Sequence, residues 1–260
     1  MSPAVTIIMP AYNAARTIES SVRSALAQTR ADFELIIIDD CSTDGTNAII
    51  ARCVAGDPRI KPLRNERNKG VAFSRNLGVQ QAAGKWVAFL DSDDLWHPDK
   101  LKSQLEFMEY VNAPISYTAS AFIDETGRRY KYIMPAEFEI NAFDLLKHNL
   151  MSCSSVIVRR DIMARHQMRD GAIHEDFAAW LDILRSESLN AYGLDKPLLV
   201  YRLSKHSKSS VRIKSALMML RTLLAAGFAL TPALLYTGRY AVHSVVKRFK
   251  IMSGGFDNHR

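Results

Sequence analysis

Apolar runs of four or five residues alternate with amphipathic stretches through the first hundred positions of the chain. The run Leu35-Ile36-Ile37-Ile38 is apolar at every position, which is typical of a central parallel strand covered by helices on both faces. Periodicity predicts strands at 5–9, 33–39, 60–64 and 86–90, and helices at 17–28, 46–55 and 71–82. A repeated strand–helix order implies right-handed crossovers. We therefore expect an α/β protein with a mainly parallel, Rossmann-like sheet.

The regular alternation of predicted strands and helices ends after Pro98. Here the pattern predicts helices at 100–111, 142–148 and 176–186, and strands at 115–122, 129–134, 155–159, 190–194 and 197–201. This mixed α+β part is expected to form the other wall of a site at the edge of the sheet. The expected organisation is one domain over residues 1–212, with halves at 1–98 and 99–212, followed by a helical tail over 213–260.

The tail differs sharply in charge from the rest of the chain. From Lys196 to Arg260 there are twelve Lys and Arg residues and a single acid, Asp257, whereas the preceding 195 residues carry 22 basic and 26 acidic side chains. This asymmetry indicates an anionic partner for the tail. No nucleic-acid-binding module is recognisable, so we expect no nucleic-acid partner. An anionic membrane surface is the expected partner.

The tail is also apolar, with basic residues spread through it. Residues 217–236 are its best candidate for a membrane span, but Arg221 interrupts them, and the uncharged part is shorter than the ~20 residues that a span needs. The sequence Leu230-Thr231-Pro232 predicts a break between two helices. Two amphipathic helices lying in the membrane interface are expected. The alternative is a helical pair packed on the body of the protein.

The cysteines and the amino-terminal sequence bear on the compartment. Cys41, Cys53 and Cys153 are odd in number and lack metal-ligand spacing, which favours a reducing environment without disulfides. The sequence has no signal-peptide pattern. Together with the basic tail, this predicts a cytoplasmic protein, peripheral at the inner face of the plasma membrane.

Three carboxylates follow the apolar run Trp86-Val87-Ala88-Phe89-Leu90, in the sequence Asp91-Ser92-Asp93-Asp94. Like charges at a strand end repel one another and are costly to desolvate. A divalent cation resolves both problems, and Mg²⁺ or Mn²⁺ often takes one or two protein carboxylates while water and phosphates fill the other positions. The sequence therefore indicates a metal–phosphate site. The alternative is a solvated turn that caps the next helix.

The carboxyl ends of the predicted parallel strands should meet at one crevice, whose chemistry suits a nucleotide. Tyr12 offers an aromatic face for a base, and Asp40 can accept a hydrogen bond from a base N–H while Asp39 braces it. Each of these residues also has an ordinary structural interpretation as a core, capping or solvated side chain. The residues assigned to nucleotide binding are Pro10, Tyr12, Asn13, Asp40, Asn68, Gly70, Arg75, Asp91 and Ser92, of which Asn68, Gly70 and Arg75 can approach ribose or phosphate.

Three stretches of sequence resemble the signature blocks of family 2 glycosyltransferases, which have the GT-A fold. The blocks are 5–13 (VTIIMPAYN), 38–46 (IDDCSTDGT) and 88–94 (AFLDSDD), within a match over residues 4 to about 105 that continues more weakly to about 210. The resemblance implies inverting transfer from a nucleotide-sugar, usually a UDP-sugar, with Mn²⁺ or Mg²⁺. It implies that residues 1–98 hold the donor and that residues 99–212 hold the acceptor.

The resemblance also implies roles for individual residues. Asp91 and Asp93 would form the metal-binding pair, with Asp93 as the direct ligand. Asp176 would be the catalytic base, with Glu175 as the alternative. Contacts with the diphosphate are implied for Arg202, Lys205 and His206.

Sequence blocks typical of processive synthases are absent, which favours transfer of one sugar to a glycan or lipid-linked acceptor in polysaccharide or cell-envelope biosynthesis. A dehydrogenase is disfavoured because Pro10-Ala11-Tyr12-Asn13 lacks the glycine-rich turn. A phosphatase of the haloacid dehalogenase type is disfavoured because the acidic pair follows the fourth strand and not the first. The remaining alternative is a catalytically inactive nucleotide-sugar-binding or scaffold protein at the membrane surface.

Overall fold

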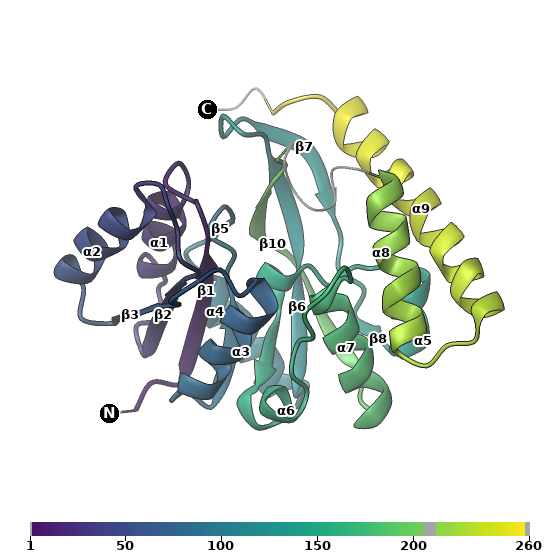
Figure 1. Cartoon of the computed structure of the whole chain (residues 1–260), viewed down its shortest axis with the longest axis horizontal. Helices are drawn as coiled ribbons and strands as arrows, with labels where there is room; N and C mark the ends of the chain where they lie inside the picture. The colour runs from purple at the N-terminus through teal and green to yellow at the C-terminus, as the bar shows by residue number, and fades with distance from the viewer. Residues whose placement is uncertain (1, 205–211, 258–260) are drawn as a thin grey trace.

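The computed structural model describes residues 2–204 and 212–257 (Figure 1). Within these residues the strands form one ten-stranded sheet with the central order β3-β2-β1-β4-β9-β6-β10-β5. Its first four strands are parallel neighbours, as the sequence predicted. Their bounds are β1 Val5–Ala11, β2 Phe33–Asp39, β3 Ile60–Arg64 and β4 Trp86–Phe89. The order 3-2-1-4 brings the carboxyl ends of β1 and β4 side by side.

Helices cover both faces of this parallel part. Alternate residues of each strand point to opposite faces, so Ile8 and Ile38 pack in one core cluster while Ile7 and Ile37 pack in another. The first cluster includes residues of α3, and the second includes residues of α1, α2 and α4. These helices span Ile18–Leu26 (α1), Thr46–Gly56 (α2), Val71–Gln81 (α3) and Lys100–Tyr110 (α4). The two-sided covering explains why the strands are apolar at nearly every position.

The second half adds mixed pairing to the sheet. β9 is antiparallel to both β4 and β6, whereas β10 is parallel to β6. The remaining strands are β5 Leu95–Trp96, β6 Ile115–Ile123, β7 Arg129–Met134, β8 Glu139–Ile140, β9 Ile157–Arg159 and β10 Ala191–Arg202. The helices of this half are α5 Ala142–Lys147, α6 Arg160–Arg165 and α7 Glu175–Ser186, and a single 3₁₀ turn spans Cys153–Ser155.

The structure corrects the sequence prediction for the end of the sheet. The two strands predicted at 190–194 and 197–201 are one strand, β10, with register shifts on either side of Pro197. Proline lacks the N–H that a regular ladder uses, so it lies at an irregularity. β5, β8 and α6 were not predicted, because two to six residues are too few to show a period.

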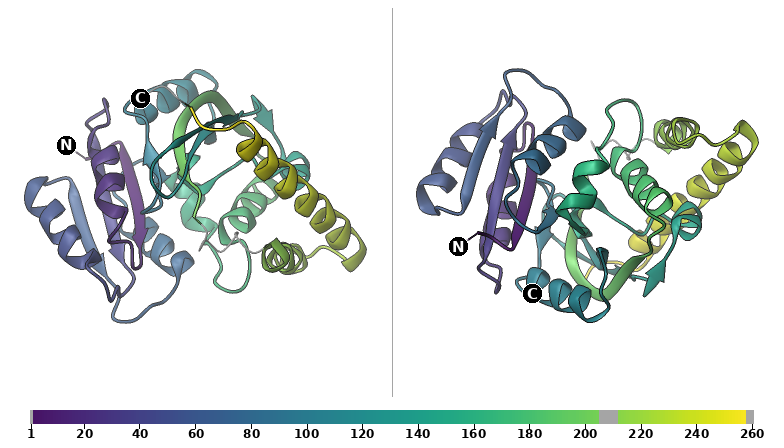
Figure 2. Two further views of the ribbon diagram at one scale, coloured as in Figure 1. Left: turned by 90° about the horizontal axis from the view of Figure 1, so that it is seen from above. Right: turned by 90° about the horizontal axis from the view of Figure 1, so that it is seen from below.

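Two helices close the chain: α8 (Arg212–Ala225) and α9 (Leu230–Ser253). The predicted break is present, and α9 begins at Leu230 with Pro232 in its first turn, where a missing N–H removes no helical hydrogen bond. The two helices pack on each other, α8 contacts α7, and α9 contacts α5 and β7. In Figures 1 and 2 they lie on the side of the molecule opposite α2.

The helical pair is packed on the body of the protein by one face only. Leu223 and Ala233 are fully buried in the main core cluster, and Ile251 packs with Phe122 and Met134. Several large apolar side chains of α9 remain exposed: Leu230, Leu234, Leu235, Val242, Val245, Val246, Phe249 and Met252. In the described ranges, 2–204 and 212–257, none of the helices combines the length and the hydropathy that crossing a bilayer requires.

Candidate active site

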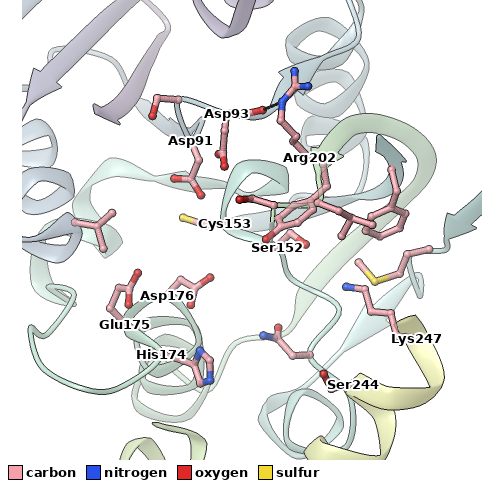
Figure 3. A pocket seen from close by; sticks show the side chains of 18 of the residues that line it. Asp91, Asp93, Ser152, Cys153, His174, Glu175, Asp176, Arg202, Ser244 and Lys247 are labelled. Carbon is pink, nitrogen blue, oxygen red and sulfur yellow. Dashed lines mark hydrogen bonds between the residues drawn. The ribbon is translucent and has the colours of Figure 1, made fainter. Parts of the chain in front are cut away.

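A cavity of about 1130 Å³ lies beyond the carboxyl ends of β1 and β4 and reaches across to α7 and α9 (Figure 3). Most of the site residues expected from the sequence line it: Pro10, Tyr12, Asn13, Asp40, Arg75, Asp91, Ser92, Asp93, Glu175, Asp176 and Arg202. Asn68 and Gly70 are not part of the lining that the structure describes. Lys205 and His206 lie outside the described residues.

The loops after β1 and β2 are tied together at one end of this cavity. The backbone N–H of Asn13 donates to Ser42 Oγ at 3.0 Å, and Asn13 Oδ1 accepts from the backbone N–H of Thr43 at 2.9 Å. Asn13 has a φ of 49°, a conformation that asparagine tolerates better than most residues. Beside it the ring of Tyr12 is 49% exposed and borders the cavity. The arrangement leaves an aromatic face open for stacking.

Asp40 accepts hydrogen bonds from the loop that follows β3. Its Oδ1 accepts from Asn65 Nδ2 at 2.7 Å and from the backbone N–H of Lys69 at 2.9 Å. Its Oδ2 accepts from the backbone N–H of Gly70 at 2.8 Å. The ribose or phosphate contacts expected of Asn68 and Gly70 stay predictions, and both residues take part in the structure of this loop. The N–H of Gly70 is used by Asp40, and Asn68 Oδ1 also accepts from it at 3.1 Å.

Arg75 connects the two halves of the site. Its guanidinium donates to Asp91 Oδ1 at 2.6 Å and to Glu175 Oε1 at 3.1 Å, and its side chain is only 4% exposed. The structure places Arg75 between two carboxylates, and the ribose or phosphate contact that the sequence suggested for it stays a prediction. Charge-assisted hydrogen bonds of this kind are among the strongest in proteins. Arg75 therefore fixes the position of Asp91, in the turn after β4, relative to Glu175 at the start of α7.

The turn after β4 is held by Arg202 of β10. Its Nε donates to the backbone carbonyl of Asp93 at 2.9 Å, and its backbone N–H donates to Asp94 Oδ1 at 2.9 Å. Arg202 therefore shapes the acidic turn, besides bordering the cavity where a diphosphate contact was expected. Asp94 is 1% exposed and had no assigned role, and within the described chain its Oδ2 has no hydrogen-bond partner.

The electrostatics of this turn suit a cation. Burial, reinforced by the charge of Asp91, raises the pKa of Asp93 to about 6. Burial and the charges of Asp93 and Asp91 also raise the pKa of Asp94. These shifts mean that the ionised turn is costly without a compensating positive charge. No cluster of three or more His, Cys, Asp or Glu side chains with metal-binding geometry occurs in the described residues. The pair Asp91 and Asp93 fits Mg²⁺ or Mn²⁺, which needs only one or two carboxylates when phosphates and water supply the rest.

The two acids at the start of α7 have different surroundings. Glu175 is paired with Arg75, whereas Asp176 takes part in no ion pair among residues 2–204 and 212–257. Asp176 Oδ1 accepts from the backbone N–H of Phe177 at 2.7 Å, and its side chain lines the cavity (Figure 3). Burial and the charge of Glu175 raise the pKa of Asp176. The sequence left both acids open as the base, and this asymmetry favours Asp176.

The C-terminal helices contribute to the site in a way that the sequence did not predict. His174 donates its backbone N–H to Thr222 Oγ1 of α8 at 3.0 Å, and its Nε2 lies 3.1 Å from the carbonyl oxygen of Ser215. These contacts anchor the residue that precedes the two acids. The residues of α9 that line the cavity are Tyr240, His243, Ser244, Val246, Lys247, Arg248, Lys250 and Ile251. In the sequence, only the basic residues of the tail indicated that α9 meets an anionic partner, and nothing indicated that it lines the cavity.

Comparison with known proteins agrees with this architecture. The family model described as "Glycosyl transferase family 2" matches residues 6–166. The chain is 38% identical over 214 residues to the putative teichuronic acid biosynthesis glycosyltransferase TuaG of Bacillus subtilis, covering 82% of this chain and 84% of that protein. It is 36% identical over 211 residues to the UDP-Glc:α-D-GlcNAc-diphosphoundecaprenol β-1,3-glucosyltransferase WfgD of Escherichia coli, covering 81% of each.

Solved structures share the fold. S. aureus TarS residues 1–349 in complex with UDP-GlcNAc gives a TM-score of 0.69 at 20% identity, covering 96% of this chain and 75% of that one. The mannosyltransferase PcManGT of Pyrobaculum calidifontis, in complex with GDP-Man and Mn²⁺, gives a TM-score of 0.69 at 17% identity. The match covers 98% of this chain and 76% of that one. The fold is therefore GT-A, and the chain belongs to glycosyltransferase family 2. It is an inverting glycosyltransferase, which confirms the class expected from the sequence blocks.

Proposed function

We propose that this enzyme transfers one sugar from a UDP-sugar to a lipid-linked glycan acceptor at the inner face of the plasma membrane. The observation that carries the proposal is that the acidic turn at Asp91 and Asp93 faces the same cavity as the carboxylate of Asp176, which forms no ion pair with any described residue. Relatives support the substrate classes, since WfgD is named for UDP-Glc and for a diphosphoundecaprenol-linked acceptor. UDP-Glc is therefore the first donor to test.

In this proposal residues 1–98 bind the donor. The exposed ring of Tyr12 stacks on the base, and the edge of Asp40 that borders the cavity accepts a hydrogen bond from a base N–H. Asp91 and Asp93 hold Mn²⁺ or Mg²⁺. When bound, the metal neutralises charge on the donor diphosphate. Arg75 keeps Asp91 in place through its buried ion pair and so acts as a positioning residue.

Residues 99–212 hold the acceptor beside Asp176. An inverting displacement requires the acceptor hydroxyl to lose its proton as its oxygen attacks the anomeric carbon. Asp176 accepts this proton as general base, because its carboxylate lines the cavity without an ion-pair partner among the described residues. Burial and the charge of Glu175 raise the pKa of Asp176, which makes its carboxylate a stronger base. Holding the two substrates in line supplies much of the remaining rate enhancement.

The transfer assay is the direct test of the proposal. Purified enzyme with Mn²⁺ is given radiolabelled UDP-Glc, UDP-GlcNAc or GDP-Man, together with an undecaprenyl-diphosphate-linked GlcNAc acceptor, and the labelled lipid is extracted and counted. We expect transfer from a UDP-sugar that stops when EDTA removes the metal. Nucleotide binding without transfer from any donor would instead favour an inactive binding or scaffold protein.

The outward face of α9 supports membrane contact. Leu235, Val242 and Phe249 are exposed and repeat every seven residues, which places them on one side of the helix. Neither α8 nor α9 contains an acidic residue. A basic helix with an exposed apolar stripe is suited to an anionic membrane interface.

Vesicle binding tests this surface. In co-sedimentation with vesicles of phosphatidylglycerol and phosphatidylethanolamine, we expect the wild type to bind and the double variant Leu235→Glu/Phe249→Glu to bind at least about tenfold more weakly, since two apolar anchors are replaced by anions. The matched control is Tyr110→Glu, which changes an 89% exposed residue at the end of α4, away from α9. Equal binding of all three proteins would contradict the proposed membrane contact.

A further inference from the structure

The cavity is acidic on one side and basic on the side formed by α9. Asp91, Asp93 and Asp176 lie towards the strand ends and α7, while Lys247 projects from α9 into the space across from them (Figure 3). The donor functions already assigned use the acidic side and the loops after β1 and β2. They leave the basic side without a role.

Lys247 has no anionic partner among the residues that the structure describes. It makes no hydrogen bond or ion pair with any residue in 2–204 or 212–257, and its Nζ lies 5.3 Å from the ring centroid of Phe122. The side chain is half-buried, and this burial lowers the pKa of Lys247 to about 8. An ammonium that is withdrawn from water without a counter-charge is unfavourable. A bound anion would relieve that cost.

The groups around Lys247 on its own wall do not supply a negative charge. His148 and His243 meet edge to face with ring centroids 4.3 Å apart, and burial together with the neighbouring His148 lowers the pKa of His243. Lys250 and Arg248 also line the cavity from α9. Two carboxylates, Glu125 and Glu137, border the same cavity from outside α9. The basic character is thus a property of the helix, which contains no acid from Leu230 to Ser253.

The two faces of α9 have complementary properties. Tyr240, Ser244, Lys247 and Ile251 are spaced by three or four residues and line the cavity, so they share the inward face. The exposed apolar stripe at Leu235, Val242 and Phe249 occupies another face. A molecule with an anionic head and an apolar chain can therefore place its head at Lys247 while its chain continues toward a membrane at the outer side of the same helix.

We propose that Lys247 binds the diphosphate of the prenyl-linked acceptor and so orients the acceptor sugar toward Asp176. This inference rests on the proposed function and names the group on the acceptor that α9 recognises. Lys247 is a specificity-determining residue here and takes no part in the proton transfer. The donor diphosphate is a less suitable partner, because its place is with the metal at Asp91 and Asp93.

Calorimetric titration with farnesyl diphosphate tests the assignment without requiring turnover. The full-length protein is first saturated with UDP and Mn²⁺, so that the donor diphosphate site is filled. We expect Lys247→Met to weaken farnesyl diphosphate binding by about tenfold or more, the effect of losing one hydrogen-bonded charge pair. Lys247→Arg should retain most of the affinity. Lys214→Met removes an exposed charge from α8, outside the cavity lining, and should bind as the wild type does.

The outcomes separate this inference from the proposed function. Wild-type protein that binds UDP but not farnesyl diphosphate would overturn the role of Lys247 and leave the donor site intact. Equal affinity of wild type and Lys247→Met would also overturn it, as would weaker binding of UDP by Lys247→Met, which would assign the lysine to the donor. Failure of the wild type to bind UDP would instead contradict the proposed function. Farnesol is the neutral control, and Lys247→Met should not change its binding.

Discussion

Replacing Asp176 by asparagine is expected to lower kcat by about 10²–10⁴-fold, the usual contribution of a general base, while the affinity for UDP changes little. Asparagine keeps the size of the side chain and can still accept the hydrogen bond that the N–H of Phe177 donates to Asp176. It cannot accept the proton of the acceptor hydroxyl. Initial rates at saturating UDP-sugar and acceptor, together with calorimetric titration of UDP, measure the two quantities separately.

The pH profile gives a second readout for the same variant. A base works only when deprotonated, and the pKa of Asp176 is raised by burial and by Glu175. Wild-type kcat should therefore fall as the pH is lowered through this raised pKa and level off above it. The residual activity of Asp176→Asn should lack this acidic limb.

Glu175→Gln is the matched control, because it changes the adjacent acid. Its partner Arg75 keeps the ion pair with Asp91, so we expect a smaller loss of kcat and a retained acidic limb. The reverse result, with the larger loss in Glu175→Gln, would make Glu175 the base.

Local sequence determined the parts of this fold that depend on a regular period. The parallel strands are buried on both faces, so their apolar runs are continuous, and the helices between them have amphipathic spacing. The acidic turn could be recognised because Asp91 and Asp93 follow a strand directly. The GT-A fold and the glycosyltransferase class were predicted from the resemblance of three sequence blocks to family 2 glycosyltransferases, and both are confirmed.

Other features depend on contacts between distant parts of the chain, which no local pattern records. Arg75 meets Asp91 and Glu175 across 16 and 100 residues. Arg202 reaches the acidic turn from β10 across more than one hundred residues. For this reason the sequence did not predict the contacts of either arginine with these protein groups, and their expected contacts with phosphate or ribose stay predictions. The wall formed by α9 was missed for the same reason.

Removing the carboxylate of Asp93 is expected to abolish metal-dependent nucleotide binding. In calorimetry the wild type should bind UDP much more tightly with Mn²⁺ than with EDTA, because a cation held at Asp91 and Asp93 would neutralise the charge of the diphosphate. Asp93→Ala should weaken UDP binding in Mn²⁺ by at least about 100-fold, since even residues that only support a metal ligand contribute 10- to 100-fold. With EDTA, the variant and the wild type should bind UDP alike through the Tyr12 end of the cavity.

Asp94→Asn is the control for Asp93→Ala, because it removes a neighbouring negative charge from the same turn. Asp94 is buried, and its Oδ1 accepts from the backbone N–H of Arg202. The amide can preserve that hydrogen bond, so the effect of Mn²⁺ on UDP binding should persist in Asp94→Asn. Loss of the Mn²⁺ effect in both variants would mean that the overall negative charge of the turn attracts the metal, without a specific role for Asp93. Its loss in Asp93→Ala alone would identify Asp93 as the metal ligand, because only that variant removes a carboxylate that lines the cavity and has no protein partner among the described residues.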